Sequence, residues 1–176
     1  MSTTKWTVDP AHSEVSFRVK HMMIANVTGH LTDYDINAVT EGDDFSRASV
    51  TFTGRLHSLT TGNEQRDTHL RSADFFDAEK YQEMTFRSTS FEKRGNDYKV
   101  SGELTIRGVT RPLTLDVEFG GIQKDPWGNT KAGFTVSGKL NRKDFGLNWN
   151  AALETGGVLV SDDVRIASEI QLIKAA

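Results

Sequence analysis

Cysteine is absent from the 176 residues of this chain, and no long run of apolar residues occurs in it. The first absence excludes disulfides, thiolate nucleophiles and cysteine-based metal sites. The second excludes a membrane-spanning helix, which needs about 20 apolar residues. The net charge is −3, and acidic and basic residues are interspersed rather than gathered in a basic stripe. Neither nucleic acid nor stable insertion into a membrane is therefore expected.

Motifs of nucleotide binding and nucleophilic catalysis are absent as well. The chain contains no GxGxxG, no GxxxxGK[ST] and no GxSxG, so the sequence indicates no cofactor and no catalytic residue. The first residues, MSTTKWTVDP, lack the basic and apolar segments of a secretory signal; if Met1 is the natural start, we expect a cytoplasmic protein. The length fits one well-buried core, and we expect a single domain over residues 1–176.

Apolar and polar residues alternate in eight segments, which predicts strands with one buried face. Short turns, such as Gly95-Asn96-Asp97, favour antiparallel neighbours. Eight such strands lose their exposed edges by closing into a barrel, whose interior suits one small ligand. We therefore predict an all-β fold, an eight-stranded antiparallel barrel, with a β-sandwich as the alternative. The segments are 13–21, 27–31, 50–56, 84–86, 100–106, 113–119, 134–140 and 164–172.

Two longer insertions interrupt this series, at 60–82 and 142–163. The first contains Asn63 and Ser72, both suitable N-cap residues, and predicts one or two short helices. The second is rich in glycine and asparagine and predicts a functional loop or lid.

Four glycines fall on the inward faces of the predicted strands: Gly29, Gly54, Gly102 and Gly138. A barrel that encloses a ligand gains room from inward glycines. A small barrel also needs glycine where its strands bend or bulge, and the sequence favours neither explanation.

Two clusters of charged and aromatic residues could meet a ligand head group. In the first, Arg66 or Arg71 would bind an anionic group while Phe75 and Phe76 line the apolar part. The alternative is a surface helix with ion pairs, anchored by its phenylalanines. In the second, Arg142 and Phe145 either clasp a ligand or tie the long loop to the barrel.

The five histidines, His12, His21, His30, His57 and His69, match no metal-binding spacing. The strand pattern places His21 on an inward face but His30 and His57 on outward faces. A hydrogen-bonded structural role is the simpler interpretation of each histidine.

Several ordered motifs resemble the YceI-like family over nearly the whole chain. The opening WTVDPAHSEVSFRVKHMMIANVTGHL is similar to the start of that family, and HLRSADFFDAEKYQEMTFRSTS to its middle. VSGELTIRGVTRPLTLDVEF resembles its most recognisable motif, and LNRKDFGLNW with VSDDVRIASEIQL its C-terminal part. The resemblance implies a lipocalin-like barrel, commonly a homodimer, whose apolar tunnel binds polyisoprenoid or related lipids without catalysis.

The leading hypothesis is therefore a carrier of a long-chain amphiphilic lipid, of polyisoprenoid, isoprenoid quinone or fatty-acyl type. An enzyme acting on a lipid, with His21 or His69 as base, is one alternative, and a ligand-free structural or dimerisation module is another. The predicted lining of the tail comprises Val15, Phe17, Phe52, Leu104, Leu115, Phe134 and Val136.

Overall fold

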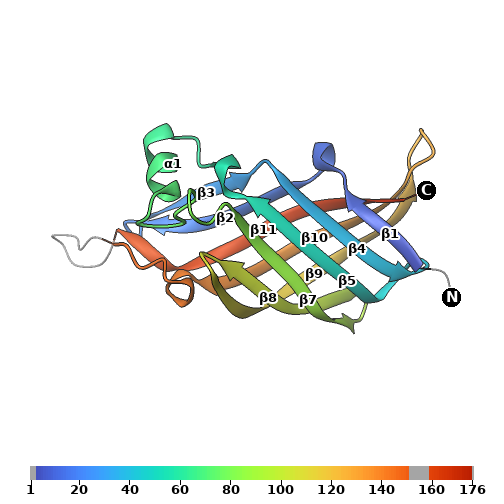
Figure 1. The fold of residues 1–176 in the computed structure, drawn as a ribbon. Coiled ribbons are helices and arrows are strands. Elements are labelled where there is room, and N and C mark those ends of the chain that lie inside the picture. Colours follow the sequence, from blue (N-terminus) through green and yellow to red (C-terminus); the bar gives the residue numbers. More distant parts are fainter. Residues whose placement is uncertain (1–2, 151–158, 176) are drawn as a thin grey trace.

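The computed structural model describes residues 3–150 and 159–175, and strands make up most of that part (Figure 1). One α-helix is present there, α1 (Glu64–Arg71), with three 3-10 turns, η1 (Pro10–His12), η2 (Leu56–Ser58) and η3 (Arg142–Phe145). None of the described helices has the length and apolar character needed to cross a bilayer. The strands are β1 (Thr3–Val8), β2 (Glu14–His21), β3 (Ala25–Leu31), β4 (Tyr34–Glu41), β5 (Asp44–Arg55), β6 (Leu59–Thr60), β7 (Glu83–Arg94), β8 (Asp97–Ile106), β9 (Val109–Lys124), β10 (Thr130–Asn141) and β11 (Val160–Lys174).

Eight of these strands form a closed antiparallel ring, in the order β1-β4-β5-β7-β8-β9-β10-β11. The ring closes where β1 pairs with the end of β11, and Thr7 lies opposite Ile173 there. Because the ring is closed, each of these eight strands is paired on both sides over at least part of its length. The predicted eight-stranded, lipocalin-like antiparallel barrel is confirmed.

The remaining strands, β2, β3 and β6, extend the sheet at the other end of the barrel. β1 pairs with residues 172–174 of β11, and β2 pairs with residues 160–169 of the same strand. The two would form one strand if Pro10, which has no N–H to give to a ladder, did not lie between them. The Asp9 carboxylate caps the turn that follows, accepting a hydrogen bond from the Ala11 N–H at 3.2 Å.

The set of strands predicted from the sequence differs from the set observed. The eight segments coincide with β2, β3, β5 and β7 to β11, so β1, β4 and β6 were missed. β4 has strict alternation of buried and exposed residues, but its inward face is Tyr34, Ile36, Ala38 and Thr40. Only one of those four is strongly apolar, so the pattern was weak in the sequence although burial in the structure is complete.

The first insertion forms one helix rather than two. The Asn63 side chain caps α1 by accepting a hydrogen bond from the Arg66 N–H at 3.0 Å. Ser72, the other predicted N-cap, lies at the C-terminal cap of α1, and turns follow it. Its hydroxyl donates back to the His69 carbonyl, which ends the helix instead of beginning a new one.

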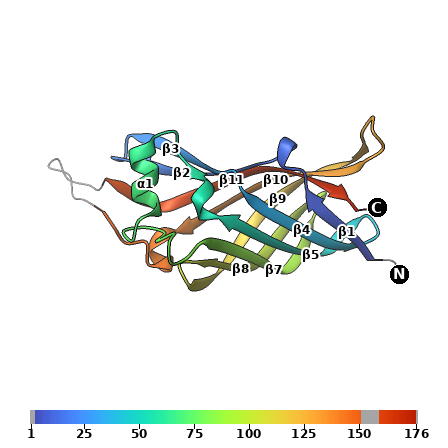
Figure 2. The same cartoon turned by 45° about the horizontal axis from the view of Figure 1, so that its top comes forward.

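The two ends of the barrel carry different elements. The start of β1 and the end of β11 lie at one end, and α1, the β2–β3 hairpin and the start of β11 lie at the other (Figures 1 and 2). We call the first the closed end and the second the mouth.

Candidate functional site

A cavity of about 620 Å³ occupies the barrel interior. Its wall is formed by the inward faces of the strands, where apolar side chains alternate with outward polar ones. The volume lies within the range of about 300–1,000 Å³ that is typical of small-molecule sites. Most of the side chains around it are aliphatic or aromatic, with polar groups concentrated at the mouth.

Aromatic side chains close the cavity at one end. Trp6, Phe45, Phe119 and Phe134 come from β1, β5, β9 and β10, and the ring centroids of Phe45 and Phe134 are 5.0 Å apart. Trp6 has no exposed surface, and its indole N–H donates to the Thr40 hydroxyl at 2.8 Å. Phe45 and Phe134 also line the cavity, so this cluster is its floor.

Neighbouring side chains cover the inward glycines. A Cβ atom on Gly29 would collide with the ring of Phe17, its cross-strand partner, and one on Gly54 would lie 2.8 Å from Phe52. Rings can thus lie flat against the wall instead of projecting into the lumen, an arrangement known for glycines paired with aromatic residues. Gly102 also lies opposite Ser88, where the β7–β8 register shifts. A bulge therefore accounts for Gly102, whereas at Gly29 and Gly54 the missing Cβ leaves room for a neighbouring ring.

Polar side chains surround the cavity at the mouth. Those that line it there include Lys20 and His21 from β2 and a group on or next to α1, namely Thr61, Asn63, Gln65, Arg66 and His69. This is the only described part of the wall where several donors and a formal positive charge gather. A ligand with an apolar tail and a polar head would therefore lie with its head here.

Asp67 fixes α1 over the mouth. Its carboxylate accepts hydrogen bonds from the Thr61 N–H at 2.8 Å and from the Thr61 hydroxyl at 2.5 Å. Burial acts to raise the pKa of Asp67, but these hydrogen bonds outweigh it, and the pKa is lowered overall. The ionised carboxylate therefore holds the first turn of the helix to Thr61, which directly follows β6.

The two arginines of α1 have different positions. Arg66 is exposed and lines the cavity, with its Nε donating to the Thr61 hydroxyl at 2.7 Å. Arg71 does not line the cavity; it donates to the Leu59 carbonyl at 2.9 Å and ties α1 to β6. Of the two predicted head-group arginines, only Arg66 is placed to meet a ligand.

Arg142 connects both described parts of the second long loop. Its side chain is 3 % exposed, and it donates to the carbonyls of Trp149 at 2.9 Å and Ser161 at 2.8 Å, and to those of Leu147 and Val160. Burial lowers the pKa of this guanidinium, and Asp162 opposes that effect. The contacts favour the loop-tying role. Residues 151–158 of the predicted lid lie outside the described part.

Four of the five histidines pair with a carboxylate. His12 lies 2.8 Å from Asp9, His57 lies 2.9 Å from Asp33, and His69 lies 2.9 Å from Asp74, while His30 contacts Glu14. The histidines do not converge, and the described residues contain no group of three metal-ligating side chains. Only His21 and His69 line the cavity.

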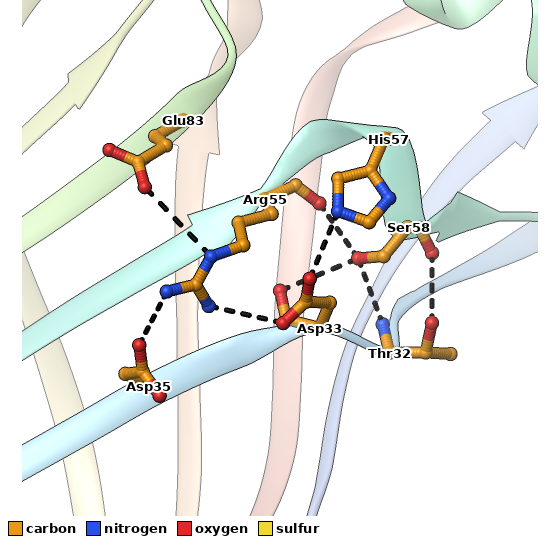
Figure 3. Close-up of polar contacts among 7 residues, drawn as sticks. All are labelled: Thr32, Asp33, Asp35, Arg55, His57, Ser58 and Glu83. Atoms are coloured by element: carbon orange, nitrogen blue, oxygen red, sulfur yellow. Dashed lines mark hydrogen bonds and ion pairs between the residues drawn. The ribbon is translucent and has the colours of Figure 1, made fainter.

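A polar cluster braces the outer wall where β3 bends into β4 (Figure 3). Arg55 lies 2.6 Å from Asp35 and 3.1 Å from Asp33, and the Ser58 hydroxyl donates to the Arg55 carbonyl at 2.7 Å. None of these residues lines the cavity. The cluster fixes the bend between the barrel and its mouth extension rather than forming part of the site.

Twelve of the fourteen predicted site residues line the cavity; Arg71 and Phe145 are the exceptions. Phe145, the last residue of η3, is 3 % exposed and packs in the core. Sequence reasoning missed other lining residues on irregular segments, among them Leu147, Trp149 and Leu159. The predicted residues that line the cavity are Val15, Phe17, His21, Phe52, Arg66, Phe75, Phe76, Leu104, Leu115, Phe134, Val136 and Arg142.

Comparison with known proteins agrees with this architecture. The chain is 40 % identical to a UPF0312 protein of Staphylococcus aureus (strain N315) over 169 residues, and this alignment covers 96 % of each chain. The crystal structure of the YceI protein of Campylobacter jejuni is 33 % identical and superposes with a TM-score of 0.77, covering 89 % of this chain and 90 % of that one. A polyisoprenoid binding domain from Saccharophagus degradans shares the fold at 15 % identity, with a TM-score of 0.66 over 97 % of this chain and 98 % of that one. The model of the YceI-like domain matches residues 6–172, and the chain therefore belongs to the YceI-like family.

Proposed function

We propose that this chain is a single-domain, non-catalytic carrier that holds one long-chain amphiphilic lipid in its barrel. The observation that carries the proposal is the apolar cavity of about 620 Å³ with an aromatic floor at one end and polar groups at the other. Ten buried methylenes would contribute about 8 kcal/mol before the cost of immobilising the ligand. Only the part of this gain that exceeds that cost appears as affinity, so a longer tail is bound more tightly.

The chemistry of the wall supports an isoprenoid or acyl tail. Phenylalanine and branched aliphatic side chains from many strands surround the lumen, and charged groups are confined to the mouth. The likeness to the polyisoprenoid binding domain from Saccharophagus degradans supports the same ligand class. Arg66 and His69 would meet the head group, with specificity coming mainly from tail length.

Native mass spectrometry of purified protein, followed by denaturing extraction, tests the proposal. We expect a co-purified isoprenoid, quinone or acyl chain. The same spectra measure the homodimer, which stays a prediction. A protein that carries no lipid and does not bind added geranylgeraniol would contradict the proposal.

A matched pair of β10 variants shows whether the ligand lies in the barrel. Val136 lines the cavity, whereas its neighbour Ser137 is exposed on the outer face. Val136→Trp fills the space of several methylenes and should weaken geranylgeraniol binding at least about tenfold. Ser137→Trp adds the same side chain outside and should leave affinity unchanged; equal effects would place the ligand elsewhere.

A further inference from the structure

Three consecutive apolar residues project from the tip of the β2–β3 hairpin. Met22 is 40 % exposed, Met23 50 % and Ile24 81 %. Single exposed apolar residues are common on soluble proteins, but a run of three at a projecting turn is not. We call Met22, Met23 and Ile24 the apolar tip.

The backbone of the apolar tip is unusual for these residue types. Met22 and Met23 have φ angles of 54° and 62°, in the left-handed region. Tight hairpin turns with this backbone ordinarily use Asn-Gly or another sequence with small or polar side chains. Methionine in this conformation is strained, and such strain is concentrated at functional sites. Folding alone therefore does not account for methionine here.

The stem of the hairpin is basic, although the chain as a whole is acidic. Residues 15–32 contain no aspartate or glutamate and carry Arg18, Lys20 and His21, while Glu14 at the base of β2 contacts His30. None of the described residues forms an ion pair with Arg18 or Lys20. An apolar tip on a basic stem is the combination that binds the interface of an anionic bilayer.

The apolar tip adjoins the mouth of the cavity. The Met22 N–H donates to the Leu159 carbonyl at 2.8 Å, and His21 pairs with Val160. His21, Leu159 and Val160 all line the cavity, whereas the three residues of the tip do not. A molecule leaving the cavity at this edge would therefore meet whatever surface the tip touches.

We propose that the apolar tip docks the mouth of the barrel onto an anionic phospholipid bilayer, so that a lipid passes between membrane and cavity without crossing water. The inference rests on the proposed function. A second copy of the chain is the less favoured occupant, because three side chains supply far less than the roughly 800 Å² per partner of a stable interface.

Sedimentation with vesicles tests the docking directly. The vesicles contain phosphatidylcholine with or without phosphatidylglycerol, and no other ligand is added. We expect the wild type to bind the anionic vesicles. M22N/M23G/I24T relieves the backbone strain, so loss of folding is not expected, and it should reduce binding at least about tenfold. Arg18→Gln should weaken binding to anionic vesicles about fivefold.

Trp127 provides the matched control. It is 82 % exposed at the turn between β9 and β10, near the closed end (Figure 1). Trp127→Ser should leave vesicle binding unchanged, because this apolar residue is far from the mouth. Equal loss in Trp127→Ser and in the tip variant would contradict docking through the mouth.

Ligand transfer separates docking from the proposed function. The tip variant should bind cis-parinaric acid presented in detergent micelles with the same affinity as the wild type. When the acid is presented in anionic vesicles, the tip variant should take it up more slowly than the wild type. Failure to bind the acid in either format would refute the carrier function. Vesicle binding equal in wild type and tip variant, or a tip variant that only converts dimer to monomer, would overturn the docking proposal.

Discussion

At the closed end of the barrel side chains fill the interior, whereas at the mouth they surround an opening. Trp6 and Phe45 are 0 % and 1 % exposed, and their ring centroids are 5.1 Å apart. At the mouth the rings of His69 and Trp149 also meet, with centroids 4.6 Å apart, but both residues are half-buried and line the cavity.

The two ends differ in how the polar groups of their backbone are hydrogen-bonded. The closed end is stabilised by direct strand pairing and by aromatic packing, both of which exclude water. The mouth is held by side chains bonded to main-chain carbonyls, such as Arg142 and Arg71, because its backbone leaves the regular ladder. Stability and access are thus assigned to opposite ends of one barrel.

The largest effect should follow from emptying the closed end. Trp6→Ala removes a fully buried ring and the hydrogen bond to Thr40. We expect the free energy of unfolding to fall by about 3–5 kcal/mol, measured by urea denaturation. Trp127→Ala, at an exposed turn, is the control and should change it by less than about 0.5 kcal/mol. Similar losses for both tryptophans would show that the closed end does not depend on this packing.

Arg142 is the corresponding residue at the mouth. Arg142→Met keeps much of the side-chain volume but leaves several loop carbonyls without a donor, which should destabilise the protein by about 2–3 kcal/mol. Arg142→Lys retains the charge but not the fork of donors, and should recover only part of the loss. Hydrogen exchange should rise in residues 143–150 before it rises in β8 and β9. A uniform rise would contradict a local role.

Gly29 tests the wall between the two ends. Gly29→Ala forces the Phe17 ring away from the wall and should cost about 1–2 kcal/mol in unfolding free energy. The displaced ring should also weaken binding of geranylgeraniol. Gly133→Ala is the control, because a Cβ there meets nothing within 4 Å. An unaltered Gly29→Ala protein would show that the ring has another equally good position.

The smallest effect concerns pH at the closed end. Burial acts to raise the pKa of Asp9, but hydrogen bonds from Lys131 and His12 outweigh it, so the pKa lies below 3.8 in the folded chain. Asp9 therefore stabilises the fold above pH 3.8 and loses that contribution as the pH falls through its lowered pKa. Asp9→Asn should cost about 1 kcal/mol at neutral pH.

The difference between Asp9→Asn and wild type should shrink as the pH falls below 3.8. Thermal unfolding at several pH values measures it, with exposed Asp116→Asn as control. A gap that stays constant down to strongly acidic pH would show that the Asp9 charge does not contribute.

The barrel could be predicted from the sequence because alternation is a local property of each strand. Segments such as 100–106 and 134–140 show their inward faces without any knowledge of partners. β4 was not predicted because tyrosine, alanine and threonine form most of its buried face. Most predicted cavity residues lie on regular strands for the same reason, whereas Trp149 and Leu159 were missed on irregular segments.

By itself the sequence determined the class of fold, the apolar faces and the family, since these depend on the order of residue types along short stretches. Only the tertiary structure decided that β1 closes the barrel on β11, that Phe17 lies over Gly29, and that Arg71 and Arg142 hold main-chain carbonyls. The first of these contacts joins residues near opposite ends of the chain. All of them depend on which segments of the chain become neighbours in space. No local pattern contains that information.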